Sequence, residues 1–169
     1  MMLFRSNRRR GATALEFTLV GIPTIFVLIS LFEAARGMWT YEMLAYAVRE
    51  GTRYAAMHGQ GCASPNACQV TVGQLASYVQ TAGPLIDPIS TLTFTTASGS
   101  TINGAMSTLK TNTTIWPPAG ANAPGQNVKI SIKYPFQTIL AIFWAGAGPP
   151  LNNSQTFYLG ASSTEPIQF

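Results

Sequence analysis

The hydrophobic pattern near the N-terminus predicts one long helix. Residues 17–32 read FTLVGIPTIFVLISLF and contain no charged side chain. Beyond this run, small or apolar residues recur at steps of three and four, which is the spacing of one helix face. They are Ala34, Met38, Tyr41, Ala45, Val48, Thr52 and Ala55. We therefore expect a helix from Thr13 to about Met57, kinked at Pro23 because proline removes a backbone hydrogen bond and crowds the preceding turn.

A second, short helix is expected after residue 70. Thr71 and Gln74 form a T-x-x-Q capping box in front of apolar residues at helical spacing, and such a box marks a helix start. Gly83-Pro84 closes the segment, because proline cannot continue a helix.

Alternating apolar and polar residues predict a small antiparallel sheet. Residues 91–95 and 128–134 alternate large apolar side chains with threonine, lysine or serine, which is the pattern of half-buried strands. Residues 156–162 are a third expected strand and residues 113–116 a weaker fourth. The segment 97–127 is rich in small and polar residues and predicts a long loop or an irregular hairpin. The expected fold class is therefore α+β.

The apolar run is long enough to span a membrane. Residues 17–32 give roughly 24 Å of helix, and residues 12–32 give roughly 31 Å, which matches the ~30 Å hydrocarbon core. Arg5, Arg8, Arg9 and Arg10 precede the run. The positive-inside bias then predicts a single-pass protein with a cytoplasmic N-terminus and an exported body. Full crossing brings Glu16 to the edge of the bilayer, where a carboxylate is costly.

The charge of the chain is concentrated in its first ten residues. Only 9% of the residues are charged and 47% are hydrophobic, whereas an average soluble protein has roughly 25% charged residues. Residues 12–169 carry six basic and six acidic side chains, so the sequence pI of about 9.3 comes from the four leading arginines. A nucleic-acid-binding protein needs a basic face on its folded part. We therefore exclude nucleic acid as a partner.

Two cysteines favour a disulfide over a metal site. Cys62 and Cys68 enclose ASPNA, whose Pro-Asn pair favours a turn, and an exported body meets oxidising conditions. A loop this short adds only about 2 kcal/mol in the chain-entropy model. Adding His58 gives three candidate metal ligands at no recognised zinc spacing. We expect no metal and no cofactor, and a solvated His58 at a helix end.

Catalytic groups are scarce, so the sequence favours a protein that is not an enzyme. His58 is the sole histidine and Asp87 the sole aspartate, and no G-x-S-x-G motif occurs. A hydrolase of the serine class needs a nucleophile, a base and an orienting acid. Glu16, Glu33, Glu42 and Glu50 all fall on the expected long helix.

One further apolar run, FQTILAIFW at residues 136–144, is too short to span a membrane. We expect it to lie in the core. The alternative is a helix whose face, formed by Phe136, Ile139, Leu140 and Phe143, lies on the outer leaflet or on a neighbouring subunit.

Two common export signals fit the N-terminus poorly. A secretory signal peptide requires a small-x-small cleavage site, but Glu33 stands where that site would lie. A twin-arginine signal requires apolar residues directly after the arginine pair, where Arg10 and Gly11 stand.

The N-terminus instead has a short basic leader, then Gly11, and then Glu16-Phe17 at the head of an apolar helix. This arrangement resembles the class III signal of type IV pilin-like proteins. The resemblance implies that a prepilin peptidase cuts between Gly11 and Ala12 on the cytoplasmic side, and that the helix is retained. Glu16 is then the fifth residue of the mature chain.

The similarity extends along the helix, through residues 33–37 and the run AVREGTRYA at residues 47–55. Residues 8–57 resemble the TadE-like family of minor pseudopilins from tight-adherence pilus systems, and VKISIKYPF and YLGASS resemble that family's closing strands. The Cys62–Cys68 loop and the segment 97–127 depart from it. The resemblance implies a pilin-like fold and a minor pilin that primes or caps a filament.

The implied partners are the inner membrane, the prepilin peptidase, a TadF-like or second TadE-like minor pilin, the major Flp-type pilin and the pilus assembly platform. The chain then divides into a leader at residues 1–11, a transmembrane and stem helix at 12–57, and an extracytoplasmic domain at 58–169. The alternative of a different class is a single-pass anchored protein whose outer domain binds a surface ligand, as an adhesin does.

Overall fold

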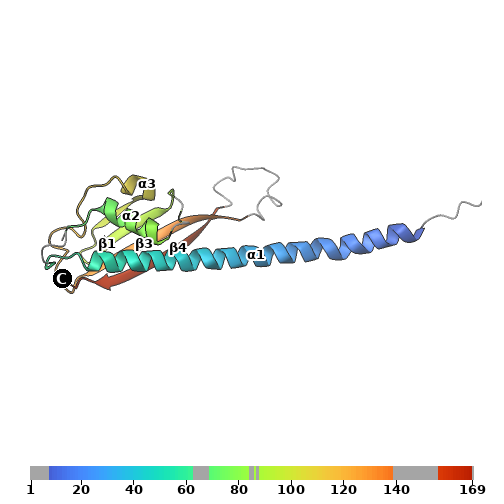
Figure 1. Cartoon of the computed structure of the whole chain (residues 1–169), viewed down its shortest axis with the longest axis horizontal. Coiled ribbons are helices and arrows are strands. Elements are labelled where there is room, and N and C mark those ends of the chain that lie inside the picture. The colour runs from blue at the N-terminus through green and yellow to red at the C-terminus, as the bar shows by residue number, and fades with distance from the viewer. Residues whose placement is uncertain (1–7, 63–68, 84–85, 87, 139–155, 169) are drawn as a thin grey trace, which may run out of the picture.

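The structure is a computed structural model that describes residues 8–62, 69–83, 86, 88–138 and 156–168. Helix α1 (Arg8–Ala56) has 49 residues and is therefore roughly 74 Å long at 1.5 Å per residue. It confirms the long helix expected from the sequence. Figure 1 shows that its first half extends away from the rest of the molecule, while its second half lies against the body.

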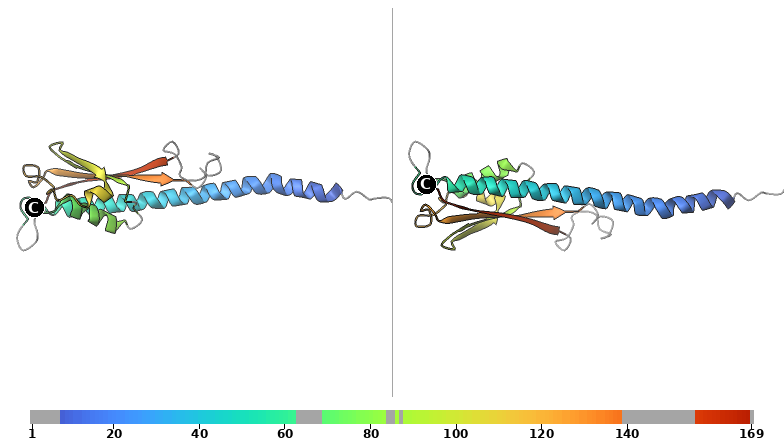
Figure 2. Two further views of the ribbon diagram at one scale, coloured as in Figure 1. Left: turned by 90° about the horizontal axis from the view of Figure 1, so that it is seen from above. Right: turned by 90° about the horizontal axis from the view of Figure 1, so that it is seen from below.

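Helix α1 continues without interruption through Pro23. Figure 2 shows a gentle bend in the N-terminal part of the helix, which contains this proline. Hydroxyl groups on both sides of it donate to carbonyls one turn back, from Thr18 to Ala14 at 3.1 Å and from Thr24 to Val20 at 2.7 Å. Such bonds keep these polar side chains compatible with an apolar surrounding, because their hydrogens are satisfied within the helix.

The second helix, α2 (Val72–Ala82), begins at the predicted capping box. The Thr71 hydroxyl accepts from the Gln74 amide at 3.2 Å, and the Gln74 side chain accepts from the Thr71 amide at 2.9 Å. The Gly83 amide donates to the Val79 carbonyl and closes the last turn. The short helix expected from the sequence is therefore confirmed at both ends.

Four antiparallel strands form one sheet in the order β2-β1-β3-β4. Three of them were expected, namely β1 (Thr91–Thr96), β3 (Asn127–Gln137) and β4 (Thr156–Pro166). The expected fourth strand at residues 113–116 is wrong, because Ile115 forms only an isolated bridge with Thr71. The fourth strand is instead β2 (Thr101–Ala105), which forms a hairpin with β1.

The β1–β2 hairpin occupies the start of the segment that was expected to be a long loop or an irregular hairpin. Its turn contains Gly99 at φ 81°, a backbone angle that side chains with a Cβ rarely adopt. A single short turn, α3 (Met106–Leu109), follows directly. The composition of this segment concealed the strand, because β2 reads TINGA and exposes most of its polar atoms.

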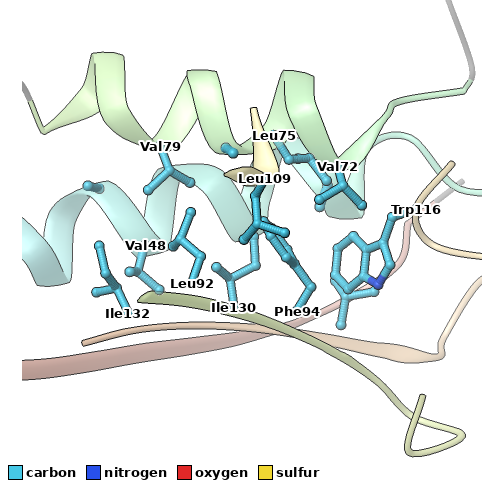
Figure 3. Packing of buried hydrophobic residues seen from close by; sticks show 14 of the residues in the cluster. Val48, Val72, Leu75, Val79, Leu92, Phe94, Leu109, Trp116, Ile130 and Ile132 are labelled. Carbon is cyan, nitrogen blue, oxygen red and sulfur yellow. The ribbon is translucent and has the colours of Figure 1, made fainter. Parts of the chain in front are cut away.

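The body has two layers, with α1 and α2 side by side on one face of the sheet (Figure 2). Figure 3 shows the core between the layers, with Val48 and Val79 from the helices facing Leu92, Ile130 and Ile132 from the strands. The opposite face of the sheet carries threonine, serine and lysine side chains. It is the polar side of the alternation that predicted the strands.

The helix face that packs on the body coincides only in part with the apolar stripe noted in the sequence. Val48, Thr52 and Ala55 of that stripe are buried, but Met38 is 71% and Tyr41 48% exposed. The buried face is completed by Leu44 and Ala47, with Gly51 between the two helices. The sequence offered two apolar faces in this region, and periodicity alone could not choose between them.

The apolar run at residues 136–144 begins in a strand and not in a helix. Phe136 lies in β3, paired with Phe157 of β4, and is half-buried. The helical face proposed as an alternative is therefore wrong at its first residue. Ile139, Leu140 and Phe143 lie outside the described residues.

Candidate functional site: the two halves of helix α1

Apart from Glu16 near its start, the first half of α1, residues 13–32, here called the exposed half, is apolar on all sides. It contains an 18-residue window with a mean hydropathy of 2.1, and no part of that window is buried within the chain. Its large side chains from Leu15 to Phe32 are exposed, except that Ile29 is half-buried. A helix that is apolar all round requires an apolar surrounding, and this length matches a single membrane crossing. This single apolar helix fits a single-pass membrane anchor.

The residues predicted to govern processing lie at the start of the exposed half or directly before it. Gly11 and Ala12 belong to the backbone of α1. Glu16 follows Ala12 by four residues, so one helical turn separates them and they share a face. Phe17 is exposed and its ring lies beside Gly21. Glu16 forms no ion pair with a side chain that the structure describes.

The second half of α1, residues 33–56, here called the stem half, begins at a buried ion pair. Glu33 is only 6% exposed, and its Oε2 accepts from Arg36 Nη2 at 2.9 Å. The same Arg36 nitrogen donates to the Gln137 carbonyl, and the guanidinium carbon lies 4.4 Å from the centre of the Phe136 ring. Two residues of α1 and the end of β3 thus form a clamp at the point where the helix meets the body.

The clamp joins segments that are about a hundred residues apart along the chain, Arg36 on α1 and Phe136–Gln137 on β3. From the sequence, Glu33 was placed on the long helix and argued against a signal-peptidase site, but its contact with Arg36 was not predicted. The feature of the sequence that could have indicated this contact was a charged pair at i,i+3 directly after the apolar run. The buried carboxylate of Glu33 is tolerated because it faces the partly exposed guanidinium of Arg36, which in turn packs on the Phe136 ring.

Further along the stem half, α1 and α2 approach closely at Gly51. A Cβ placed on Gly51 would lie 2.4 Å from Val79 Cγ2, a distance that real side chains do not occupy. Val79 is fully buried and short, so it cannot swing away. Gly51 is therefore the residue that allows the two helices to pack, and it lies within the AVREGTRYA run.

The cysteine prediction stays untested. Cys62 follows the end of α1, whereas Cys68 lies outside the described residues. His58 is half-buried and not solvated as expected, since its ring lies 4.3 Å from the Tyr54 ring and its Nδ1 is 2.6 Å from the Tyr54 carbonyl. Within the described ranges no group of three His, Cys, Asp or Glu side chains is placed to hold a metal ion.

The comparison with known protein families gives one match. Residues 11–53 match the family model described as TadE-like protein. The matched segment covers the exposed half and most of the stem half, including Glu16, the Glu33–Arg36 pair and Gly51. No curated protein and no solved structure matches the chain. The similarity to TadE-like proteins therefore covers the apolar and stem halves of the helix, at residues 11–53, and does not extend to the sheet.

Proposed function

We propose that this chain is a minor pilin or pseudopilin that helps to assemble, prime or cap a tight-adherence pilus. The observation that carries the proposal is the contrast within α1. The apolar window of the exposed half is not buried by the described parts of the chain, whereas the stem half holds a folded body at a fixed position on the same helix. Such a helix is suited to pack first among lipids and then among the helices of other subunits, because both surroundings are apolar.

In this proposal the prepilin peptidase removes residues 1–11 on the cytoplasmic side and leaves Ala12 as the new N-terminus. The body faces the periplasm, and the chain carries no catalytic role. Its partners are another minor pilin of the TadE-like or TadF-like kind, the major Flp-type pilin and the assembly platform. The support comes from the TadE-like match and the basic leader that precedes the apolar half.

Glu16 has a specific role in this assembly. Cleavage creates an amine on Ala12 that is positively charged at pH 7, given a reference pKa of about 8. Both the amine and the carboxylate are costly at the edge of the bilayer, and pairing relieves both costs. The attraction exceeds the ~1 kcal/mol expected in water, because the surroundings have a lower dielectric constant. We infer that Glu16 pairs with the amine of an adjacent subunit and thereby sets the axial register.

The test is Glu16→Gln, which keeps the size of the side chain and removes its charge. We expect the variant to be shortened at residue 11 and inserted in the membrane, yet to lose co-purification with the other pilins. Glu42→Gln is the matched control, because Glu42 is an exposed glutamate on the stem half. Normal piliation in Glu16→Gln would show that Glu16 has no role in assembly. An unprocessed product would show that the prepilin peptidase recognises Glu16 instead.

The cleavage site has a separate test. Gly11→Leu should leave the full-length protein in the membrane, as detected by mass spectrometry of the intact chain. A Gly11→Leu product that still lacks residues 1–11 would show that the assigned site is wrong. A simple anchored protein of the alternative class would retain Met1 in the unaltered chain as well.

A further inference from the structure

A pair of stacked tyrosines lies at the end of the body that is farthest from the exposed half. Tyr54 of α1 and Tyr78 of α2 stack at 4.4 Å between ring centres with an angle of 16° between their planes. The other side of Tyr54 is occupied by His58. Tyr78 is 38% exposed, so the stack as a whole presents an aromatic surface to solvent at the Tyr78 end. Figure 1 shows that α1 ends near the C-terminus of the chain, away from the exposed half.

Two hollows share this tyrosine pair as a common wall. The first has a volume of about 260 Å³ and is also lined by Glu50, Arg53, Glu165 and Gln168. The second has a volume of about 390 Å³ and is lined by hydroxyl and amide side chains together with Lys110. Each hollow has the size of a sugar ring or slightly more. Together they form a groove with an aromatic centre and polar walls.

The polar groups of the groove have hydrogen-bonding capacity to spare. The side chains of Glu165 and Gln168 make no hydrogen bond or ion pair with the residues that the structure describes. Asn112, in the second hollow, uses its Oδ1 to accept from the Thr114 amide, which leaves its NH₂ group for another acceptor. The groove could not be predicted from the sequence, because Glu165 and Tyr78 follow no motif and are ordinary surface residues of a strand and a helix.

The charges of the groove balance. The first hollow contains Glu50, Glu165 and Arg53, and the second contains Lys110, so two carboxylates and two bases line the groove as a whole. Arg53 Nη1 lies 3.5 Å from Glu50 Oε1. A site for a cation would have an excess of carboxylates, and a site for an anion an excess of bases. Balanced charges, unused donors and acceptors, and an aromatic surface together match a neutral ligand with many hydroxyl groups.

We propose that this groove binds a neutral oligosaccharide. The C–H face of one sugar ring packs on Tyr78, as amphipathic ligands do on tyrosine. Glu165 accepts hydrogen bonds from ring hydroxyls, and Gln168 and Asn112 both supply donors. This binding activity goes beyond the assembly role, and it involves none of the residues of the exposed half.

The test uses the full chain in lipid nanodiscs, because maltoside detergents carry a disaccharide head group that would compete. A printed array of neutral oligosaccharides comes first, and saturation-transfer NMR and titration with lactose, maltose and N,N′-diacetylchitobiose follow. We expect saturable binding of at least one of these disaccharides. Tyr78→Leu should weaken that binding by about tenfold, as should Glu165→Gln, which keeps the shape of the side chain.

Tyr158→Leu is the matched control, because Tyr158 is an exposed tyrosine on β4 that lines neither hollow. It should bind the disaccharide as the unaltered chain does. Circular dichroism checks that each variant is folded. If Tyr78→Leu does not fold, Glu165→Gln still tests the groove. Absence of binding on the array and to all three disaccharides would overturn the proposal. The proposal would also be overturned if folded Tyr78→Leu and Glu165→Gln bound the disaccharides as tightly as the unaltered chain. Binding of arginine amide, a cationic probe, in place of the sugars would overturn it as well.

These outcomes are distinct from those of the assembly proposal. Tyr78→Leu should leave processing and co-purification with other pilins unchanged, whereas Glu16→Gln should leave disaccharide binding unchanged. Failure of one proposal therefore leaves the other standing.

Discussion

The two halves of α1 share one backbone and have opposite surroundings. Residues 13–32 are apolar on every face and none of their side chains is buried, whereas residues 33–56 bury one face against α2, β3 and β4. Contacts within the same chain therefore hold the stem half in place. The exposed half presents apolar side chains to its surroundings, and such a helix requires an apolar surrounding. A single helix thus carries both the support of a folded body and an apolar surface that no described part of the chain buries.

The boundary between the halves is chemical as well as spatial. The Glu33–Arg36 pair is where charged residues reappear after the apolar run, and it is also where β3 first meets the helix through Phe136 and Gln137. The clamp therefore sets the height at which the body sits above the end of the apolar run.

The largest expected effect comes from truncating one leucine side chain to alanine in each half of α1. Leu44 is fully buried in the stem half, so Leu44→Ala should lower the free energy of unfolding of the body by about 2–5 kcal/mol. Leu28→Ala, in the exposed half, should leave that free energy unchanged. Urea unfolding in nanodiscs, followed by intrinsic fluorescence, measures both. Equal effects of the two variants would contradict the division of the helix into two environments.

A smaller effect is expected from adding one methyl group. Gly51→Ala should destabilise the body by about 1–3 kcal/mol, because the new Cβ meets Val79 and overpacks the contact between the helices. Gly37→Ala is the control, since its Cβ would lie 3.7 Å from Phe136, an ordinary contact. Thermal unfolding of the two variants gives the difference. If Gly51→Ala were as stable as Gly37→Ala, α1 and α2 would not approach as closely as the structure has them.

The smallest expected effect lies at the boundary. Arg36→Met removes the partner of a buried carboxylate, which costs about 1–3 kcal/mol for a fully buried group. The Arg36 side chain is 36% exposed, so solvent screening should reduce the loss to about 1 kcal/mol. Hydrogen exchange should rise at the paired ends of β3 and β4 and not at β1.

The double variant Glu33→Gln with Arg36→Met is the control for this loss. It should be more stable than Arg36→Met alone, because no unpaired charge is left buried. If the single and double variants were equally stable, the clamp would owe its effect to packing on Phe136 and not to charge.

Several elements followed from local sequence because their causes are local. The capping box at Thr71 and Gln74 fixed the start of α2, and the alternation at residues 91–95 and 128–134 fixed β1 and β3. Each pattern is decided by residues within one or two turns of each other. The strand at Thr101–Ala105 was not predicted because its sequence has only one large apolar residue, Ile102, and no run of alternation. Pairing with β1 is what holds it in the sheet.

The sequence by itself determined that α1 is long, that its first half is apolar all round and that a basic leader precedes it. It also carried the TadE-like resemblance, because that signal lies within one continuous helix. Only the tertiary structure decided which face of the stem half is buried, why Gly51 has no side chain, and that Arg36 meets Phe136. Tyr54, Tyr78 and Glu165 likewise come together only in the folded chain. The physical reason is that these contacts join residues far apart in sequence, whose positions depend on how helices and sheet pack and not on the periodicity of any one segment.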